Sequence, residues 1–202
     1  MSTAKIAVFV SGGGTNLQAL IDAQSSGIIS SGKIEVVVSS NPNAYALERA
    51  AKAGIDGVVV SKKECGSQEV FERNIFSVLD DYQIDIIVLA GFMSILSADF
   101  TSRYPNKIIN VHPSLIPSFC GKGFYGLKVH EAALEYGVKV SGATVHFVNE
   151  IPDGGEIIMQ KAVAIRDNDT PETLQKRIMR NAEWKILPKS VELVCAKLIN
   201  ER

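Results

Sequence analysis

The sequence predicts an α/β protein with an open, mostly parallel twisted sheet, helices on both faces (a Rossmann-like fold) and antiparallel strands toward the C-terminus. Short runs of Ile and Val alternate with segments whose apolar residues are spaced three and four apart, the spacing of an amphipathic helix. Few polar residues interrupt the Ile/Val runs, which is typical of parallel strands covered on both faces. After residue 111, two strand-like segments follow each other across a short turn, which indicates an antiparallel pair.

The first part of the chain alternates between strands and helices. The predicted strands cover residues 5–10, 34–39, 57–61, 85–90 and 107–111, and the predicted helices cover residues 17–23, 44–53, 68–81 and 98–104. Strand–helix–strand units of this length connect neighbouring parallel strands by right-handed crossovers. The sequence therefore predicts one continuous parallel sheet for this part.

The second part begins with a segment rich in proline and glycine, residues 112–126, which is predicted to be a long ordered loop. A helix over 128–136 follows, then strands over 141–148 and 156–165, joined by a turn at 152–155. Thr170 is predicted to cap the last helical segment, with Pro171 at its first position. Pro188 is predicted to break this segment before a final helix over 190–199.

Composition excludes several classes of protein. The chain has 202 residues, 46% hydrophobic and 21% charged, which favours one globular domain, residues 1–202. A net charge of −1 lacks the basic footprint of nucleic-acid and membrane-surface binders. Three widely spaced cysteines exclude a disulfide framework and a zinc site. We expect a cytoplasmic protein with no metal, nucleic-acid or membrane partner.

A glycine-rich segment, Ser11–Asn16, follows the first predicted strand. Backbone N–H groups of such a turn, together with the N-terminus of the next helix, favour an anion. No Lys-Ser/Thr pair follows the glycines, so the segment is not a Walker A loop. Leu17 occupies the place of the third dinucleotide-fingerprint glycine, and no carboxylate follows the second strand. A phosphomonoester is the ligand that this pattern favours; a tight turn without a ligand is the alternative.

Two further motifs carry candidate catalytic groups. Asn110 and His112 are two residues apart at the end of a predicted strand, and Pro113 keeps His112 extended. An amide donor beside an imidazole stabilises a developing oxyanion, while the imidazole also moves protons. Asp153, in the later turn, could pair with a distant histidine and raise its pKa. The alternatives are an Asn–His pair that bonds a loop and a turn with no catalytic role.

The chain resembles the phosphoribosylglycinamide formyltransferases, a family of folate-dependent enzymes, in four blocks: S-G-G-G-T-N-L-Q-A-L-I-D, L-A-G-F-M-S-I-L-S, I-I-N-V-H-P-S-L-I-P and H-F-V-N-E-I-P-D-G-G. The last two are shared across formyltetrahydrofolate hydrolases and transferases, and the first points to the glycinamide ribonucleotide branch. The resemblance implies transfer of the formyl group of 10-formyltetrahydrofolate to the primary amine of glycinamide ribonucleotide, in purine biosynthesis.

The resemblance also implies roles for individual residues. The catalytic residues are Asn110, His112 and Asp153: the amine attacks directly, protonated His112 and Asn110 stabilise the oxyanion, and Asp153 supports His112. The residues expected to bind glycinamide ribonucleotide are Gly13, Gly14, Thr15, Asn16 and Glu183. Those expected to bind 10-formyltetrahydrofolate are Gln68, Met93, Ser94, Ile95, Leu96, Asn110, Asn149, Glu150, Ile151, Pro152 and Asp153.

By the same resemblance, residues 1–111 form a nucleotide- and phosphate-binding half and residues 112–202 a folate-binding and closing half, in a monomer or homodimer without a metal. Ser94 and Gln68 depart from the family pattern, because arginines are frequent there. Water as the acceptor, an amino sugar nucleotide as the acceptor, and a folate- or nucleotide-binding module without catalysis are the alternatives. His130 and His146 are predicted to be packing or surface residues, with a pocket-edge role open for His146.

Overall fold

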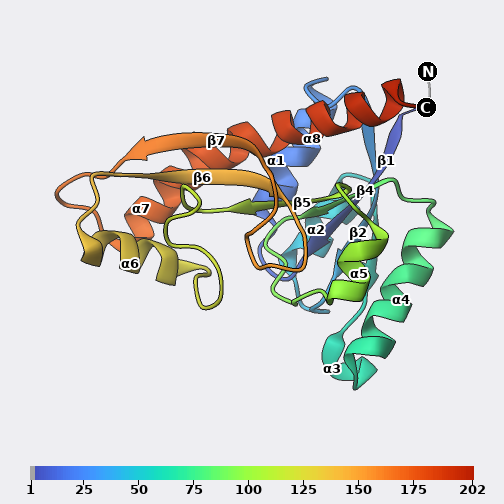
Figure 1. Ribbon diagram of the computed structural model, residues 1–202. Coiled ribbons are helices and arrows are strands. Elements are labelled where there is room, and N and C mark those ends of the chain that lie inside the picture. Colours follow the sequence, from blue (N-terminus) through green and yellow to red (C-terminus); the bar gives the residue numbers. More distant parts are fainter. Residues whose placement is uncertain (1–2) are drawn as a thin grey trace.

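The computed structural model describes residues 3–202, whose strands form one seven-stranded sheet in the order β3-β2-β1-β4-β5-β6-β7 (Figure 1). The parallel strands are β1 (Ala4–Val10), β2 (Gly32–Ser39), β3 (Asp56–Val59), β4 (Ile86–Leu89) and β5 (Ile108–His112). The antiparallel strands are β6 (Val140–Phe147) and β7 (Ile157–Ala164). The predicted fold class is confirmed.

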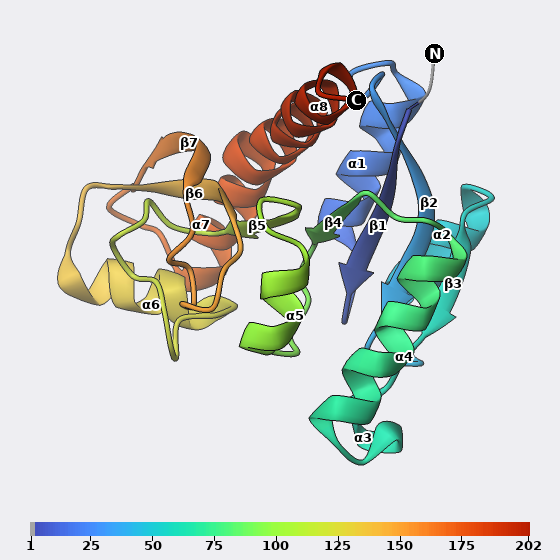
Figure 2. The same ribbon diagram turned by 45° about the vertical axis from the view of Figure 1, so that its right-hand side comes forward.

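Helices cover both faces of the sheet (Figure 2). On one face α1 (Thr15–Ser25), α2 (Tyr45–Lys52), α7 (Pro171–Ile178) and α8 (Trp184–Asn200) bury one apolar cluster. On the other, α4 (Gln68–Asp81) and α5 (Ala98–Arg103) bury a second, which contains Phe9, Phe71 and Phe100. Helix α6 (Leu127–Tyr136) packs beside α7. Because both faces are covered, the central strands carry apolar residues at consecutive positions.

Two predictions for the helices need correction. A short helix, α3 (Lys62–Cys65), capped by the Ser61 side chain, was not predicted; one turn is too short for a periodic pattern. Pro188 does not break the C-terminal helix but lies inside α8. A π-helical turn, Met179–Glu183, directly precedes α8. Pro188 has no N–H to give to the Trp184 carbonyl, so α8 continues through it with one regular hydrogen bond missing.

The sheet brings the candidate catalytic strand beside a strand that comes more than thirty residues later. Strand β6 pairs with β5 so that His146 lies opposite Asn110 and Thr144 lies opposite His112. The segment between β6 and β7, which contains Asp153, returns over the end of β5.

None of the helices in residues 3–202 is long and apolar enough to cross a membrane.

Candidate active site

The structure brings the three predicted catalytic side chains into one cluster. His112 ends β5 and is buried, and its Nδ1 lies 3.6 Å from Oδ2 of Asp153. Asn110, two residues earlier on the same strand, reaches the cluster through a fourth residue, His146, because its amide nitrogen lies 3.2 Å from Nε2 of His146. The same His146 nitrogen lies 3.5 Å from Oδ1 of Asp153. Asp153 therefore sits between two imidazoles.

Both ring nitrogens of His112 face an oxygen acceptor. Nε2 lies 2.9 Å from the carbonyl of Phe119, in the loop after β5, while Nδ1 faces the Asp153 carboxylate. Only the protonated ring donates to both. Burial lowers the pKa of His112, and the charge of Asp153 opposes this without cancelling it. The site thus favours the imidazolium by geometry but penalises its charge by desolvation.

Asp153 is held by its loop in an ionised form. Its backbone has a positive φ of 56°, and its Oδ2 accepts a hydrogen bond of 2.8 Å from the N–H of Gly121. Burial by itself would raise the pKa of Asp153, but the hydrogen bond with His146 and the charge of His112 hold it below its usual value. Gly155 lets this loop return, since a Cβ there would lie 1.7 Å from the carbonyl of Phe147.

His146 belongs to the cluster, although the sequence predicted a packing or surface residue and left only a pocket-edge role open for it. Its Nδ1 lies 2.8 Å from the carbonyl of Phe147, and its Nε2 lies 3.2 Å from the Asn110 amide nitrogen and 3.5 Å from Oδ1 of Asp153. It therefore orients Asn110 as well as contacting Asp153. The signal for this role was its place on a strand just before the candidate loop, but its partner strand could not be identified from the sequence. His130, by contrast, is fully buried on α6, as expected for a packing residue.

The glycine-rich segment forms the turn between β1 and α1. Gly14 has φ of 69°, and a Cβ there would lie 2.7 Å from Cβ of Ala46, so a side chain at this position is excluded. The carbonyls of Gly12 and Gly13 accept from Ala46 N–H and the Arg49 side chain. In residues 3–202, no intramolecular hydrogen bond uses the N–H of Gly12, Gly13 or Gly14. These donors are therefore free for an anion.

Asn16 and Glu183, both predicted to bind the acceptor, are joined although 167 positions separate them. The Asn16 amide donates to Oε2 of Glu183 at 2.8 Å, and both residues are buried. The other atom of the Asn16 amide, Oδ1, is buried and has no hydrogen-bond partner in residues 3–202. Burial raises the pKa of Glu183 to about 7, and the hydrogen bond from Asn16 opposes this rise.

The raised pKa of Glu183 predicts a pH-dependent stability. The folded protein holds the Glu183 proton more tightly than the unfolded chain does. The stability that this proton contributes is therefore present at pH 4.5 and lost as pH rises to about 7. The unfolding free energy of Glu183→Gln minus that of the wild type is the quantity compared. This difference is expected to be roughly 3 kcal/mol more favourable to the variant above pH 7 than at low pH. Urea denaturation of both proteins across this range measures it. A difference independent of pH would contradict the assignment.

Two exposed loops flank the catalytic cluster with apolar side chains. Met93 is 59% exposed and Ile95 78% exposed in the segment after β4, and Ile151 is 59% exposed in the loop of Asp153. Ser94 and Leu96 are partly buried, and Asn149 turns its loop by accepting the N–H of Ile151 at 2.9 Å. Glu150 and Pro152 are exposed in the same loop. Uncovered apolar side chains on two neighbouring loops are typical of a ligand-binding surface.

Gln68 lies under one of these loops and bonds to the protein itself. Its amide nitrogen donates to Oε1 of Glu72 at 2.5 Å and to the carbonyl of Ile95 at 3.0 Å. Glu72 is buried on α4, and its two oxygens also accept the N–H and hydroxyl of Ser97, both at 2.6 Å. Ser97 caps α5. Glu72 therefore fixes the end of the Met93–Leu96 segment, and Gln68 shares in that support.

Removing the Glu72 carboxylate is expected to destabilise this region. Glu72→Ala leaves the N–H and hydroxyl of Ser97 without a partner in a partly buried place, which costs about 2–4 kcal/mol of unfolding free energy. Chemical denaturation measures the loss, and the exposed neighbour Glu69→Ala is the matched control with a change below about 0.5 kcal/mol. Equal effects of the two substitutions would show that Glu72 does not anchor the segment.

No group of three or more metal-ligating side chains lies together within residues 3–202. The cluster instead offers two imidazoles, one carboxylate and one amide around a single point. These groups can donate hydrogen bonds to a developing oxyanion and transfer protons. The glycine-rich segment has free backbone N–H groups, and two loops carry exposed apolar side chains. Together with the catalytic cluster, they are suited to a reaction between a phosphate-bearing acceptor and a flat apolar donor.

Comparisons with known proteins identify the family. Residues 4–191 match the family model described as formyl transferase. The chain is 43% identical over 184 residues to phosphoribosylglycinamide formyltransferase of Haemophilus influenzae, covering 91% of this chain and 84% of that protein. The fold superposes on the crystal structure of glycinamide ribonucleotide transformylase 1 from Symbiobacterium toebii with a TM-score of 0.90 at 39% identity, covering 96% and 89% of the two chains.

Other relatives contain the matching region within a longer protein. The human trifunctional purine biosynthetic protein adenosine-3 is 44% identical over 193 residues, which cover 96% of this chain but only 18% of that protein. The match to the family model nevertheless extends over most of the chain and includes the strands, loops and helices that build the cluster. The resemblance stated from the sequence is confirmed, and this chain belongs to the formyl transferase family.

Proposed function

We propose that the chain transfers the formyl group of 10-formyltetrahydrofolate to the primary amine of glycinamide ribonucleotide, giving formylglycinamide ribonucleotide and tetrahydrofolate in purine biosynthesis. The observation that carries the proposal is the cluster of Asn110, His112, His146 and Asp153 between the free amides of the glycine turn and the two apolar loops. The names of the similar proteins support the same acceptor.

Both substrates have a candidate surface in the fold. The phosphate of the nucleotide binds the N–H groups of Gly13 and Gly14 and the start of α1, and its ribose lies against Asn16 and Glu183. The folate ring lies between the Met93–Leu96 segment and the loop 149–153. Residues 1–111 thus supply most of the nucleotide site and residues 112–202 the closing half.

The reaction needs no protein nucleophile. The amine nitrogen forms a bond to the formyl carbon, the bond from that carbon to the folate nitrogen breaks, and one proton passes from the amine to the departing nitrogen. His112 and the Asn110 amide stabilise the tetrahedral oxyanion, and Asp153 stabilises the imidazolium. The developing oxyanion adds a second negative charge beside His112, which raises the pKa that burial lowers.

The Phe119 carbonyl now accepts the Nε2–H that the oxyanion would receive. In the reacting complex, the formyl oxygen takes the place of this carbonyl, and the loop 113–126 shifts to allow it.

Neither the attack of the amine nor the departure of the folate nitrogen uses a metal. The free thiols of all three cysteines fit a reducing compartment such as the cytoplasm, and the enzyme works as a monomer or homodimer on small-molecule substrates.

A direct experiment is to incubate the full chain with both substrates and identify the products by mass spectrometry. Formylated nucleotide that appears with tetrahydrofolate supports the proposal. Formate in its place would make the chain a formyltetrahydrofolate hydrolase, the alternative in which water is the acceptor.

The glycine turn offers a specific test of acceptor binding. A Cβ added at Gly13 would have no atom within 4 Å, and the residue carries no positive φ, so Gly13→Val is compatible with the fold. Its side chain would block the approach of a phosphate to the backbone amides. The nucleotide KM is expected to rise at least about tenfold, which corresponds to about 1.4 kcal/mol, while the folate KM stays within twofold.

Steady-state kinetics with each substrate varied in turn measures the two constants. Ala162→Val, which adds a β-branched side chain at an exposed position of β7, is the matched control. Equal changes in the two KM values of Gly13→Val would contradict phosphate binding at the glycine-rich segment.

A further inference from the structure

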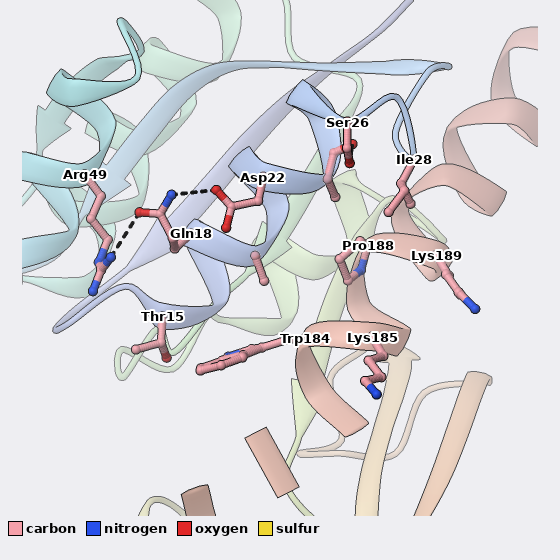
Figure 3. A pocket seen from close by; sticks show the side chains of 12 residues that line it. Thr15, Gln18, Asp22, Ser26, Ile28, Arg49, Trp184, Lys185, Pro188 and Lys189 are labelled. Carbon is pink, nitrogen blue, oxygen red and sulfur yellow. Dashed lines mark hydrogen bonds between the residues drawn. The ribbon is translucent and has the colours of Figure 1, made fainter. Parts of the chain in front are cut away.

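A cleft between α1 and α8 lies outside the catalytic cluster (Figure 3). Its volume is about 590 Å³, within the range of roughly 300–1,000 Å³ that small-molecule sites occupy. Thr15 lines it at the N-terminus of α1, and Trp184 lines it at the N-terminus of α8. Their neighbours Asn16 and Glu183 form the hydrogen bond described above, and the cleft extends from this pair toward Ile28.

The lining combines an apolar floor with a cationic rim. The apolar lining residues are Ala19, Ala23, Ile28, Trp184 and Pro188. The charged lining residues are Arg49, Lys185, Lys189 and Asp22, three cations against one carboxylate in a protein whose net charge is −1. A locally positive rim over an apolar floor favours a ligand that has an apolar body and an anionic group.

The two lysines are not used inside the protein. Lys185 and Lys189 lie on successive turns of α8, and neither takes part in an ion pair or a side-chain hydrogen bond within residues 3–202. On the opposite wall, Gln18 links Arg49 to Asp22, accepting from the first at 3.0 Å and donating to the second at 2.9 Å (Figure 3). The only carboxylate of the lining is therefore held by its own helix.

Trp184 adds an aromatic face and an unsatisfied donor. Its indole N–H is buried and has no acceptor in residues 3–202. Pro188, four residues later, has no N–H to give to the Trp184 carbonyl, so the helix turn that lines the cleft lacks one of its regular bonds. The indole face that lines the cleft is suited to a ligand whose aromatic ring stacks on it.

We propose that the α1/α8 cleft binds a small aromatic anion of the nucleoside monophosphate class, with its ring against Trp184 and its phosphate between Lys185 and Lys189. This ligand is distinct from the proposed formyl acceptor, which has a phosphate but no aromatic ring. No residue of the catalytic cluster lines the cleft, and Thr15 is the one lining residue that it shares with the predicted acceptor site.

Trp184 is the only tryptophan of the chain, so its fluorescence reports on the cleft. We expect adenosine 5′-monophosphate to quench it saturably, with a dissociation constant below about 1 mM. The double variant Lys185→Gln/Lys189→Gln is expected to weaken binding at least about tenfold, without a change in the transferase kcat. Lys62→Gln/Lys63→Gln, an exposed pair on α3, is the matched control and should bind like the wild type.

Ribose 5-phosphate separates the cleft from the glycine turn, because it carries the phosphate without the ring. It is expected to quench at least about tenfold less well than adenosine 5′-monophosphate. Equal quenching by both compounds, unchanged binding by the α8 double variant, or no saturable quenching would each overturn the proposal. Fluorescence that depends on protein concentration without added ligand would assign the cleft to a second copy of this chain and would also overturn it.

Discussion

Asp153→Asn is expected to lower kcat by about 10²–10⁴-fold, the range for a lost acid–base partner. Asparagine keeps the shape of the side chain and can still accept the Gly121 N–H, so the loop keeps its conformation. It cannot carry the charge that opposes the burial of His112. The imidazolium is therefore lost from a site that already penalises it.

The pH profile adds a second readout for this variant. Asp153 raises the pKa of His112, so its removal moves that pKa further down. The decline of kcat toward high pH, which follows loss of the His112 proton, is expected at a lower pH in Asp153→Asn than in the wild type. Steady-state rates between pH 5 and 9 measure the shift. Glu156→Gln, exposed just after the loop, is the matched control. Near-wild-type activity with an unshifted profile would exclude Asp153 from catalysis.

His112→Ala is expected to lower kcat by about 10²–10³-fold, the typical cost of removing one oxyanion donor. The lost ring is the group that touches both Asp153 and the carbonyl of Phe119. Because substrate binding rests on other residues, both KM values should stay within a few-fold of the wild type. The imidazole ring also fills buried space, so the folding of the variant needs a separate check by denaturation.

Added imidazole provides the discriminating measurement for His112→Ala. A free imidazole that enters the space of the lost ring restores a donor next to Asp153, and the rate should rise with its concentration. The variant His146→Ala tests the neighbouring ring, which orients Asn110 without being the proposed proton donor. Its decrease in kcat should be smaller than that of His112→Ala. If His112→Ala retains activity within a factor of a few, the oxyanion must be stabilised by another group.

The strands and most of the helices could be predicted from the sequence because both faces of the sheet are covered, and covered strands read as continuous Ile/Val runs. Helix α4 has the predicted bounds, Gln68–Asp81, because Ser67 caps it and its apolar residues keep the helical spacing. Pro188 misled the prediction, since a proline is usually a breaker. The π turn before α8 likewise leaves no local sequence signal.

The candidate site was predicted in part for a similar reason. Asn110 and His112 share a strand, so their common face follows from spacing alone. The role of His146 depends on the register between β5 and β6, which places it opposite Asn110. Residues 36 positions apart in the chain carry no local signal of such a pairing. The contact between Asn16 and Glu183 and the α1/α8 cleft likewise arise only when the helices pack.

Folate release shows whether an amine on a phosphate-bearing acceptor takes the formyl group. Product tetrahydrofolate would be followed from 10-formyltetrahydrofolate with and without glycinamide ribonucleotide. The rate of tetrahydrofolate release is expected to depend on the nucleotide and to saturate as the nucleotide concentration rises. Release at the same rate without the nucleotide would mean that water is the acceptor. It would contradict both the transferase and the assignment of the free glycine-turn amides to a phosphate.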